Sequence, residues 1–385
     1  MSLGIYIQVP FCQTKCTYCN FHTGVVARER YQPYANAVCQ EIAETRELNG
    51  ETVNTIYVGG GTPSLLSPAA LGRMLDALRE KYRVEAGAET TLEADPETIH
   101  QEKAAAWLAA GFNRISMGVQ SFHDNELRAS GRMHRREDIF RATETLRVAG
   151  LQNISMDLIA GLPHQTRESW EASITELLAI RPEHVSIYLL EIDEGSRLGR
   201  ESLANGTRYS AAAIPSDDAQ AEFYESACAR LAAAGYEHYE ISNWALPGKR
   251  SRHNVKYWRR EPYLGFGAGA HSFDGAKRWA NVHDSTRYVE IITSGASTHE
   301  QVECVTSEQA LDEEIFLGLR QLEGIDLDAI AARLDIEFSR RETTLRQAIR
   351  RLEAEGFVET VGSRVRLAPS RLTVSNEVFV ELLNS

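Results

Sequence analysis

The sequence predicts an α/β protein with three consecutive regions, on three observations. From Leu3 to about Leu190, short apolar runs alternate with amphipathic, helix-like stretches, which implies a parallel sheet with right-handed crossovers. From Ser210, one helix is followed by strand-like and glycine-rich segments. Beyond Glu303, helices precede a small β pair. We therefore expect a strand–helix region, an α+β region and a C-terminal winged-helix-like domain, at residues 1–209, 210–303 and 304–385.

The first region supplies most of the predicted sheet. Its apolar runs predict strands at Leu3–Val9, Thr55–Val58, Thr90–Leu92, Arg114–Val119, Ile154–Ile159 and His184–Leu190. The stretches between them predict helices at Tyr31–Leu48, Pro68–Lys81, Thr98–Ala110, Arg136–Ala149 and Arg167–Ala179. By analogy with complete α/β barrels, functional residues belong at the carboxyl ends of these strands.

The other two regions are read in the same way. In the second we expect a helix at Asp217–Ala233 and a strand at Tyr236–Ile241. In the third, helices are expected at Ser307–Leu322, Leu327–Leu334, Arg340–Glu355 and Asn376–Leu383, with a β pair at Phe357–Val361 and Arg364–Leu367. Winged-helix folds often bind DNA, but they serve equally as lids or protein contacts. We favour a lid or docking role, because acids are interleaved with the basic residues Arg340, Arg341, Arg346, Arg350 and Arg351.

Composition excludes several classes of protein. The chain has 385 residues, and 41 Lys and Arg against 54 Asp and Glu give a net charge of −13, which argues against a nucleic-acid partner. We see neither an apolar run of membrane-spanning length nor a signal peptide, so we expect a cytoplasmic protein. Three scattered cysteines, Cys39, Cys228 and Cys304, are expected to be buried small apolar residues.

The other three cysteines, Cys12, Cys16 and Cys19, lie within eight residues directly after the first apolar run. Three thiolates leave one iron of a four-iron cluster without a protein ligand, which lets the cluster bind an outside molecule. A structural zinc site with His22 as fourth ligand is the alternative, although a second CxxC pair is missing. A disulfide is weaker still in so short a loop.

The spacing CxxxCxxC resembles the signature of the radical S-adenosylmethionine (SAM) superfamily. The flanking segments Tyr6–Cys12 and Cys16–Phe21 resemble the branch that contains oxygen-independent coproporphyrinogen III oxidase and the heme chaperone HemW. This resemblance implies a partial (β/α)6 radical SAM barrel. It also implies a [4Fe-4S] cluster on Cys12, Cys16 and Cys19, whose open iron binds the amino and carboxyl groups of SAM.

The same resemblance implies a set of SAM-binding residues at the strand ends. Glycine lets the backbone approach a ligand closely, an acid can bind ribose hydroxyls, and an arginine can pair with a carboxylate. The matching positions are Tyr6, Tyr18, Gly61, Thr62, Pro63, Glu93, Gln120, Arg132 and Asp157. Taken singly, Gly59–Gly61 is also compatible with a simple turn, Asp157 with a helix cap and Arg132 with a solvated loop charge.

A segment of the second region points to heme. His253–Trp258 fits the pattern HNxxYW, which accompanies heme binding in the chaperone family. A neutral imidazole is a good axial ligand for iron, and nearby aromatic rings can cover a porphyrin. We therefore expect His253 to contact heme, with His271 of the glycine-rich loop as a second candidate. The alternative is a hydrogen-bonded core histidine beside packing aromatics.

Two departures favour the chaperone over the oxidase. The oxidase extends its motif to CxxxCxxCxC, whereas Phe21 stands at the last position here. The oxidase also has a long segment before the cluster, whereas 11 residues precede Cys12. The resemblance thus implies a protein without assigned catalytic residues that passes heme to apoproteins of the respiratory chain, with a transient membrane-surface association. The alternatives are coproporphyrinogen III decarboxylation and, more distantly, a zinc-stabilised adaptor.

Overall fold

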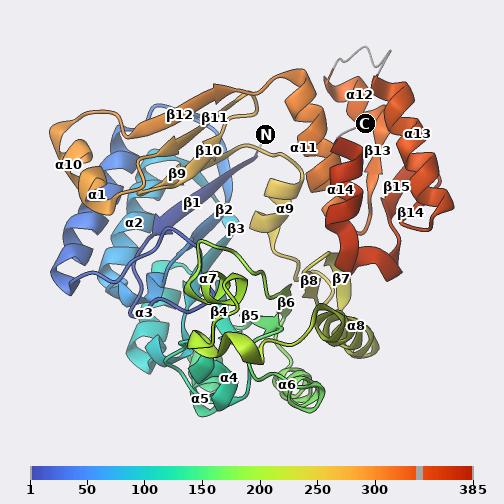
Figure 1. Ribbon diagram of the computed structural model, residues 1–385. Helices are drawn as coiled ribbons and strands as arrows, with labels where there is room; N and C mark the ends of the chain where they lie inside the picture. Colours follow the sequence, from blue (N-terminus) through green and yellow to red (C-terminus); the bar gives the residue numbers. More distant parts are fainter. Residues whose placement is uncertain (1, 335–340, 384–385) are drawn as a thin grey trace.

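One twelve-stranded sheet organises the computed structural model, which describes residues 2–334 and 341–383 (Figure 1). The strand order is β12-β11-β10-β9-β1-β2-β3-β4-β5-β6-β8-β7. Six neighbouring strands pair in parallel, namely β1 (Ser2–Val9), β2 (Thr52–Gly60), β3 (Arg83–Ala94), β4 (Arg114–Gln120), β5 (Asn153–Ala160) and β6 (His184–Leu189). They form the expected partial barrel, which stays open because β1 and β6 pair with other strands instead of each other.

Strand β1 shows why these segments become strands. Leu3, Ile5, Ile7 and Val9 are almost completely buried in the main hydrophobic core. The residues between them point to the opposite face of the sheet, because side chains alternate along a strand. One of these is Tyr6, whose ring stacks on that of Tyr57 inside the barrel. A single strand thus contributes both to the core and to the barrel interior.

The connecting helices lie on the outside of the barrel (Figure 1). They are α1 (Tyr31–Glu44), α2 (Pro68–Lys81), α3 (Gln101–Ala110), α4 (Asp124–Ala129), α5 (Arg136–Ala149) and α6 (Arg167–Ile180). The short helix α7 (Arg197–Leu203) instead lies beside the cysteine loop, where Leu198 N donates to Thr17 O. Helix α2 begins where expected because the Ser67 side chain accepts a hydrogen bond from Ala70 N. Helix α5 ends where expected because Gly150 adopts φ = 98°. Helix α3 starts later than predicted, since Pro96–Thr98 forms a separate 3₁₀ turn.

The second region extends both edges of the same sheet. Strands β7 (Glu237–Glu240) and β8 (Asn243–Ala245) continue from β6. On the other side, β1 is followed by β9 (Tyr263–Phe266), β10 (His271–Phe273), β11 (Lys277–Asn281) and β12 (His299–Cys304). The sheet therefore has no break at the predicted boundary after residue 209. The division of the chain into domains at residues 209 and 303 stays a prediction.

Strand β12 corrects one expectation from the sequence. We expected Cys304 to be buried, but it is exposed, because it ends the edge strand of the sheet. The other two scattered cysteines, Cys39 and Cys228, are half-buried and pack against the core. The helices of this second region are α8 (Asp217–Ala233), α9 (Arg252–Trp258) and α10 (Ser285–Ser294).

The C-terminal module, residues 307–334 and 341–383, has the element order of a winged-helix-like fold. Its elements are α11 (Ser307–Arg320), β13 (Ile325–Asp326), α12 (Leu327–Leu334), α13 (Arg341–Ala354), β14 (Val358–Val361), β15 (Arg364–Leu367) and α14 (Ser375–Leu383). Its three strands form a separate sheet in the order β13-β15-β14. The predicted start of α13, Arg340, lies outside the described residues.

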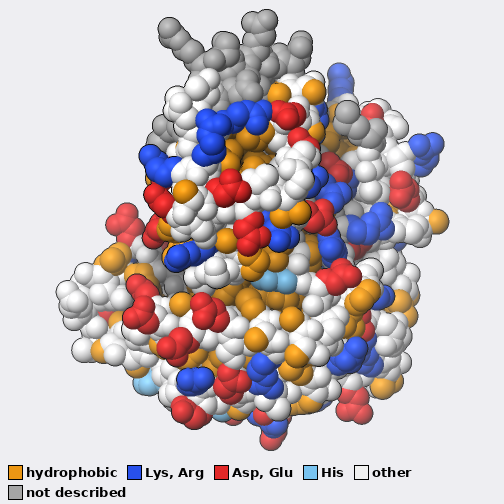
Figure 2. All heavy atoms as spheres, turned by 90° about the vertical axis from the view of Figure 1, so that its right-hand side faces the viewer, with side chains coloured by type: hydrophobic (Ala, Val, Ile, Leu, Met, Phe, Trp, Pro, Cys, Tyr) orange, Lys and Arg blue, Asp and Glu red, His pale blue; other side chains and the backbone are white. Residues whose placement is uncertain are grey.

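The C-terminal module is held against the barrel by main-chain and charged contacts. Ile241 N donates to Arg320 O over 3.1 Å, and Leu322 N donates to Tyr239 O over 3.2 Å. Figure 2 shows this side of the molecule, where acidic and basic side chains are interleaved. No helix within the described ranges is long and apolar enough to cross a membrane.

Candidate functional site

A cavity of about 630 Å³ opens at the carboxyl ends of the barrel strands. All three cysteines of the first loop line it, and so do residues from β2, β3, β4, β5 and β6. The C-terminal module closes part of its rim through Arg320, Leu372, Thr373, Ser375 and Asn376. A cavity of this size suits one cofactor- or drug-sized molecule.

The cysteine loop is fixed to the barrel at several points. Cys12 N donates to Gly24 O over 3.0 Å, which closes the loop on itself. Thr17 N donates to Ser130 O over 3.0 Å, and Leu198 N donates to Thr17 O over 2.8 Å. The backbone of the loop is therefore held by α7 and by the segment after α4. Burial raises the pKa of the Cys12 thiol, so a metal or cluster would be needed to hold it as a thiolate.

The glycine-rich segment after β2 packs directly beneath this loop. Gly61 N donates to Val9 O over 2.8 Å. A Cβ atom at Gly61 would lie 2.5 Å from Phe11 O and 2.9 Å from Cys12 Sγ. Only glycine fits at this position, so the segment is more than a simple turn: it brings the backbone of β2 against the first cysteine.

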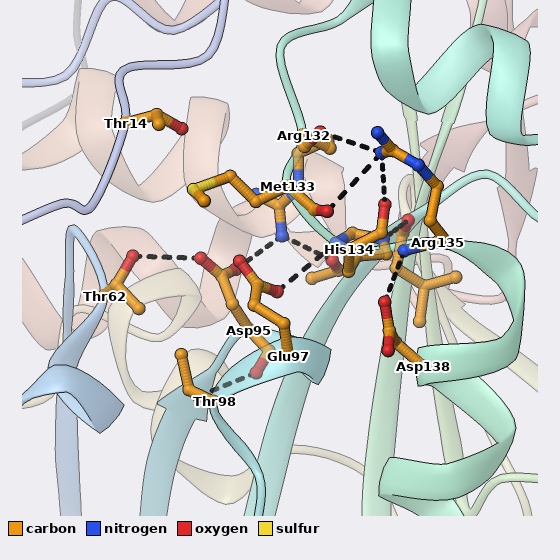
Figure 3. A network of polar contacts seen from close by, with 12 residues as sticks. Thr14, Thr62, Asp95, Glu97, Thr98, Arg132, Met133, His134, Arg135 and Asp138 are labelled. Atoms are coloured by element: carbon orange, nitrogen blue, oxygen red, sulfur yellow. Dashed lines mark hydrogen bonds and ion pairs between the residues drawn. The ribbon is translucent and has the colours of Figure 1, made fainter.

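A charged network joins the predicted residues Thr62 and Arg132 through a residue that we did not predict, Asp95 (Figure 3). Thr62 Oγ1 donates to Asp95 Oδ2 over 3.0 Å, and the Arg132 guanidinium donates to Asp95 Oδ1. The same guanidinium donates to Gly118 O over 2.7 Å and lies 3.7 Å from Cys16 Sγ. Arg132 is thus a fixed, half-buried cation beside the cysteine loop.

Figure 3 also shows His134 beside Glu97 at the back of this network. His134 Nδ1 lies 3.6 Å from Glu97 Oε2, while His134 Nε2 bonds Val119 O at 3.0 Å. Burial, followed by the charge of Arg132, lowers the pKa of His134 to about 4. Because the imidazole is neutral near pH 7, we read the contact with Glu97 as polar packing, not as an ion pair.

Two acids, Glu93 on β3 and Asp157 on β5, face the cavity with raised pKa values. Glu93 accepts from Tyr57 Oη at 2.7 Å and from Gly60 N at 2.8 Å. Burial nevertheless raises the pKa of Glu93 to about 7. Burial also raises the pKa of Asp157, although Ser186 and Ser116 donate toward it. These are the acids available for a cationic amine or for hydroxyl groups at the cavity.

Most of the predicted cofactor residues meet at this cavity. Those that line it are Cys12, Cys16, Cys19, Tyr18, Gly61, Thr62, Glu93, Gln120, Arg132 and Asp157. Tyr6, Pro63 and His253 do not line it. Tyr6 donates to Gln8 Oε1 over 2.6 Å inside the barrel, and Pro63 is buried in the turn after Thr62.

Sequence reasoning missed several residues of the cavity wall. Asp95 carried a signal, because it follows Glu93 at the end of the same strand. Tyr188, Ser242 and Arg320 carried none: they reach the cavity only through the docking of β6, β7 and the C-terminal module. The zinc alternative is not favoured by the arrangement, because His22 does not line the cavity with the three thiols.

The geometry of His253 differs from the expectation of an open axial ligand. The side chain is 1% exposed at the start of α9. Its Nδ1 lies 2.9 Å from Thr55 Oγ1, and its Nε2 lies 2.9 Å from Tyr257 Oη. Neither ring nitrogen is free for iron in this arrangement. Heme ligation by His253 stays a prediction that requires one of these bonds to break and α9 to move.

The three thiols fit a four-iron cluster better than a single ion. All three are free of disulfide bonds. Within the described residues, no three histidine, cysteine or acidic side chains are close enough to hold one metal ion. Each thiolate of a four-iron cluster binds a different iron, so the thiols need not converge on one point. With Arg132, Glu93 and Asp157 around the cavity, the donor set also suits a charged cofactor next to the cluster.

Comparisons with known proteins agree with this geometry. Residues 6–177 match the model of the Radical SAM superfamily, which is the class that the barrel and the cysteine loop define. Residues 305–370 match the HemN C-terminal domain. The structure resembles coproporphyrinogen III oxidase (HemN) from Escherichia coli, with a TM-score of 0.85 and 24% identity, covering 99% of this chain and 90% of that one. This likeness supports the fold.

Similar curated proteins identify the family within the radical SAM superfamily. The chain is 34% identical to the heme chaperone HemW of Bacillus subtilis, over 97% of each chain. It is 37% identical to the heme chaperone HemW of Escherichia coli, over 70% of this chain and 69% of that one. This chain therefore belongs to the HemW family of the radical SAM superfamily.

Proposed function

We propose that this protein is a heme chaperone that holds a [4Fe-4S] cluster, SAM and heme, and transfers heme to apoproteins. The observation that carries the proposal is the likeness to the heme chaperone HemW of Bacillus subtilis over 97% of each chain. Phe21 supports the choice of the heme chaperone over the oxidase. It is 67% exposed at the rim of the cavity, where a fourth cysteine would extend the motif.

The residues of the cavity divide into cluster ligands and cofactor contacts. Cys12, Cys16 and Cys19 would hold the cluster, which would supply the electron for one-electron reduction of a bound SAM. The backbone near Gly61 and the side chains of Thr62, Glu93, Gln120, Arg132 and Asp157 bind and orient SAM, with Tyr18 beside the cluster. Tyr6 and Pro63 support this surface from behind without lining it.

The recipients and the cellular setting are part of the proposal. We infer that the recipients are apoproteins of the respiratory chain and that the chaperone works in the cytoplasm. Phe21 and Val25 expose 67% and 60% of their side chains near the cysteine loop, which suits a transient contact with a membrane surface. The interleaved charges of the C-terminal module suit a lid or a protein contact.

Anaerobic reconstitution with iron and sulfide, followed by absorption spectra with and without hemin, tests the proposal. We expect a cluster absorption band in the wild type and a Soret band after hemin is added. Cys16→Ala should lose the cluster, while Cys304→Ala, at an exposed edge, should keep it. Wild-type protein that binds the cluster but no hemin would contradict the chaperone function.

Coproporphyrinogen III decarboxylation is the second candidate, because the fold matches that enzyme along 99% of this chain. With cluster, SAM and reductant present, we expect no sustained conversion of coproporphyrinogen III to protoporphyrinogen IX. The physical reason is the chemistry at position 21, where an apolar ring replaces a fourth cysteine. Sustained turnover would favour the oxidase over the chaperone.

A further inference from the structure

Three histidines from distant segments meet outside the cavity. His22 follows the cysteine loop, His271 begins β10, and His283 follows β11. The ring centroids are 4.6 Å apart for His22 and His283 and 6.5 Å apart for His271 and His283. His22 and His283, which are 261 positions apart in sequence, are thus brought together by the pairing of β1 with β9.

The fold provides no hydrogen-bond partner for the ring nitrogens of these three described histidines. Within residues 2–334 and 341–383, none of the three imidazoles makes a hydrogen bond or an ion pair, and His283 Nδ1 is buried without a partner. Each buried histidine elsewhere has at least one hydrogen-bonded ring nitrogen, although His134 Nδ1 is likewise buried without a hydrogen bond. The rings of His134, His184, His238 and His253 are all hydrogen-bonded. His22 and His271 are exposed, so their nitrogens are open to a ligand, while the one unpartnered buried nitrogen of the cluster, His283 Nδ1, requires an explanation.

The glycine-rich segment before β10 shapes this cluster. Gly269 adopts φ = 73°, and a Cβ atom there would lie 2.9 Å from His283 Nδ1. The backbone therefore packs directly on the imidazole. Burial, followed by His283, lowers the pKa of His271. A neutral imidazole keeps the lone pair that a metal needs.

The surroundings of the three rings suit a porphyrin. Phe21 and Val25 flank His22 in the same loop and are among the most exposed large apolar side chains of the described chain. Lys15 Nζ donates to Phe21 O over 3.1 Å, which places a half-buried cation beside the backbone of Phe21. Heme requires three kinds of contact. These are an imidazole for the iron, an apolar face for the macrocycle and a cation for a propionate.

Heme suits this place better than a bare divalent cation. Zinc needs four ligands that converge on one point. The described residues include no three histidine, cysteine or acidic side chains arranged in this way. Heme iron already has four porphyrin nitrogens and needs only one or two axial ligands. A loose group of imidazoles is therefore sufficient for heme and insufficient for zinc.

We propose that heme binds on the histidine surface, defined as Phe21, His22, Val25, His271 and His283, with an imidazole of this surface as axial ligand to the iron. The inference rests on the proposed heme-chaperone function and names the site that this function uses. It moves the axial ligand from the barrel interior at His253 to the surface beside the cysteine loop. The heme then lies outside the SAM cavity, where an apoprotein can reach it.

The test is a hemin titration of the full-length, anaerobically reconstituted protein. The variants are His22→Ala, His271→Ala, His283→Ala and the triple substitution, with His100→Ala as matched control. His100 is exposed before α3, and its side chain makes no cap hydrogen bond there. We expect the triple variant to bind hemin at least about tenfold more weakly, with a shifted Soret band. Iron and sulfide content should stay at the wild-type value in every variant.

The possible results distinguish a failure of the proposed heme site from a failure of the proposed heme-chaperone function. If wild-type protein binds no hemin, the proposed function fails together with the inference. If the triple variant binds hemin with the wild-type affinity and Soret band, the inference alone fails. If His253→Ala loses the Soret band while it stays folded and the triple variant keeps it, the axial ligand is His253. If Zn²⁺ binds to the wild type through the three histidines and hemin does not, the surface is a zinc site and the inference is overturned.

Discussion

His253 Nδ1 lies 2.9 Å from Thr55 Oγ1, which ties helix α9 to strand β2 inside the barrel. The His253 ring also stacks on Tyr57, whose hydroxyl donates to Glu93 at the cavity. The HNxxYW segment is thus joined, through two aromatic rings and a hydrogen bond, to the surface that we assign to SAM. A structural role of this kind explains its burial without any contact to heme.

Replacing His253 with Ala should therefore lower the stability of the protein. The variant loses the bonds to Thr55 and Tyr257 and leaves a cavity, so we expect the free energy of unfolding to fall by about 3 kcal/mol. Urea unfolding followed by circular dichroism measures this change. The exposed His100→Ala variant should match the wild type. A fully stable His253→Ala variant would contradict the structural role.

Gly61→Ala should lower cluster content. The added Cβ would lie 2.5 Å from Phe11 O and 2.9 Å from Cys12 Sγ, so the cysteine loop must shift. Iron and sulfide analysis after reconstitution measures the effect. Gly87→Ala in β3 is the matched control, because its Cβ would meet nothing within 4 Å. Equal cluster content in both variants would mean that the close packing of Gly61 is not required.

Glu93 should make stability depend on pH. Burial raises the pKa of Glu93 in the folded state from about 4.5 to about 7. The folded protein therefore binds the proton more tightly than the unfolded chain. The stability gained from protonated Glu93 is fully present below about pH 4.5 and is lost as the pH rises through about 7.

Glu93→Gln removes this titration while it preserves the shape of the side chain. We expect a smaller decrease in unfolding free energy between pH 5 and pH 8 than in the wild type, measured by urea unfolding at several pH values. Part of the decrease should remain, because burial also raises the pKa of Glu41 to about 7, outside the cavity. An unchanged pH profile in Glu93→Gln would show that this carboxyl group does not titrate in that range.

Arg320 should hold the C-terminal module against the barrel. Its guanidinium lies 2.7 Å from Glu240 Oε1, and the Glu240 side chain is completely buried. Removing one partner of a buried pair leaves an uncompensated charge and typically costs about 3–5 kcal/mol, with the lower end expected here because Arg320 is 28% exposed.

Limited proteolysis measures this effect. Arg320→Ala should be cleaved between the barrel and the module sooner than the wild type. Arg351→Ala is the control, because its ion pair with Glu381 is mostly exposed and contributes little. If the two variants are cleaved at the same rate, the Arg320–Glu240 pair does not fasten the module.

The parts of the fold that could be predicted are those whose sequence signals lie within a few neighbouring residues. Helices α2 and α5 begin and end where expected, because capping residues and apolar spacing act within a few positions. Strand β12 was missed, because most of its side chains are exposed and carry no apolar pattern. Its place in the sheet depends on pairing with β11.

The sequence by itself determined the superfamily, the cysteine loop and the strand-end positions expected to meet around a cofactor. These features depend on spacings within short segments, where the chain has few alternatives. The tertiary structure alone decided that Asp95 links Thr62 to Arg132, that Arg320 reaches the cavity, and that both nitrogens of His253 are engaged inside the barrel. It also brought His22, His271 and His283 together. Each of these contacts joins segments far apart in the chain, so it arises only when the sheet and the C-terminal module have assembled.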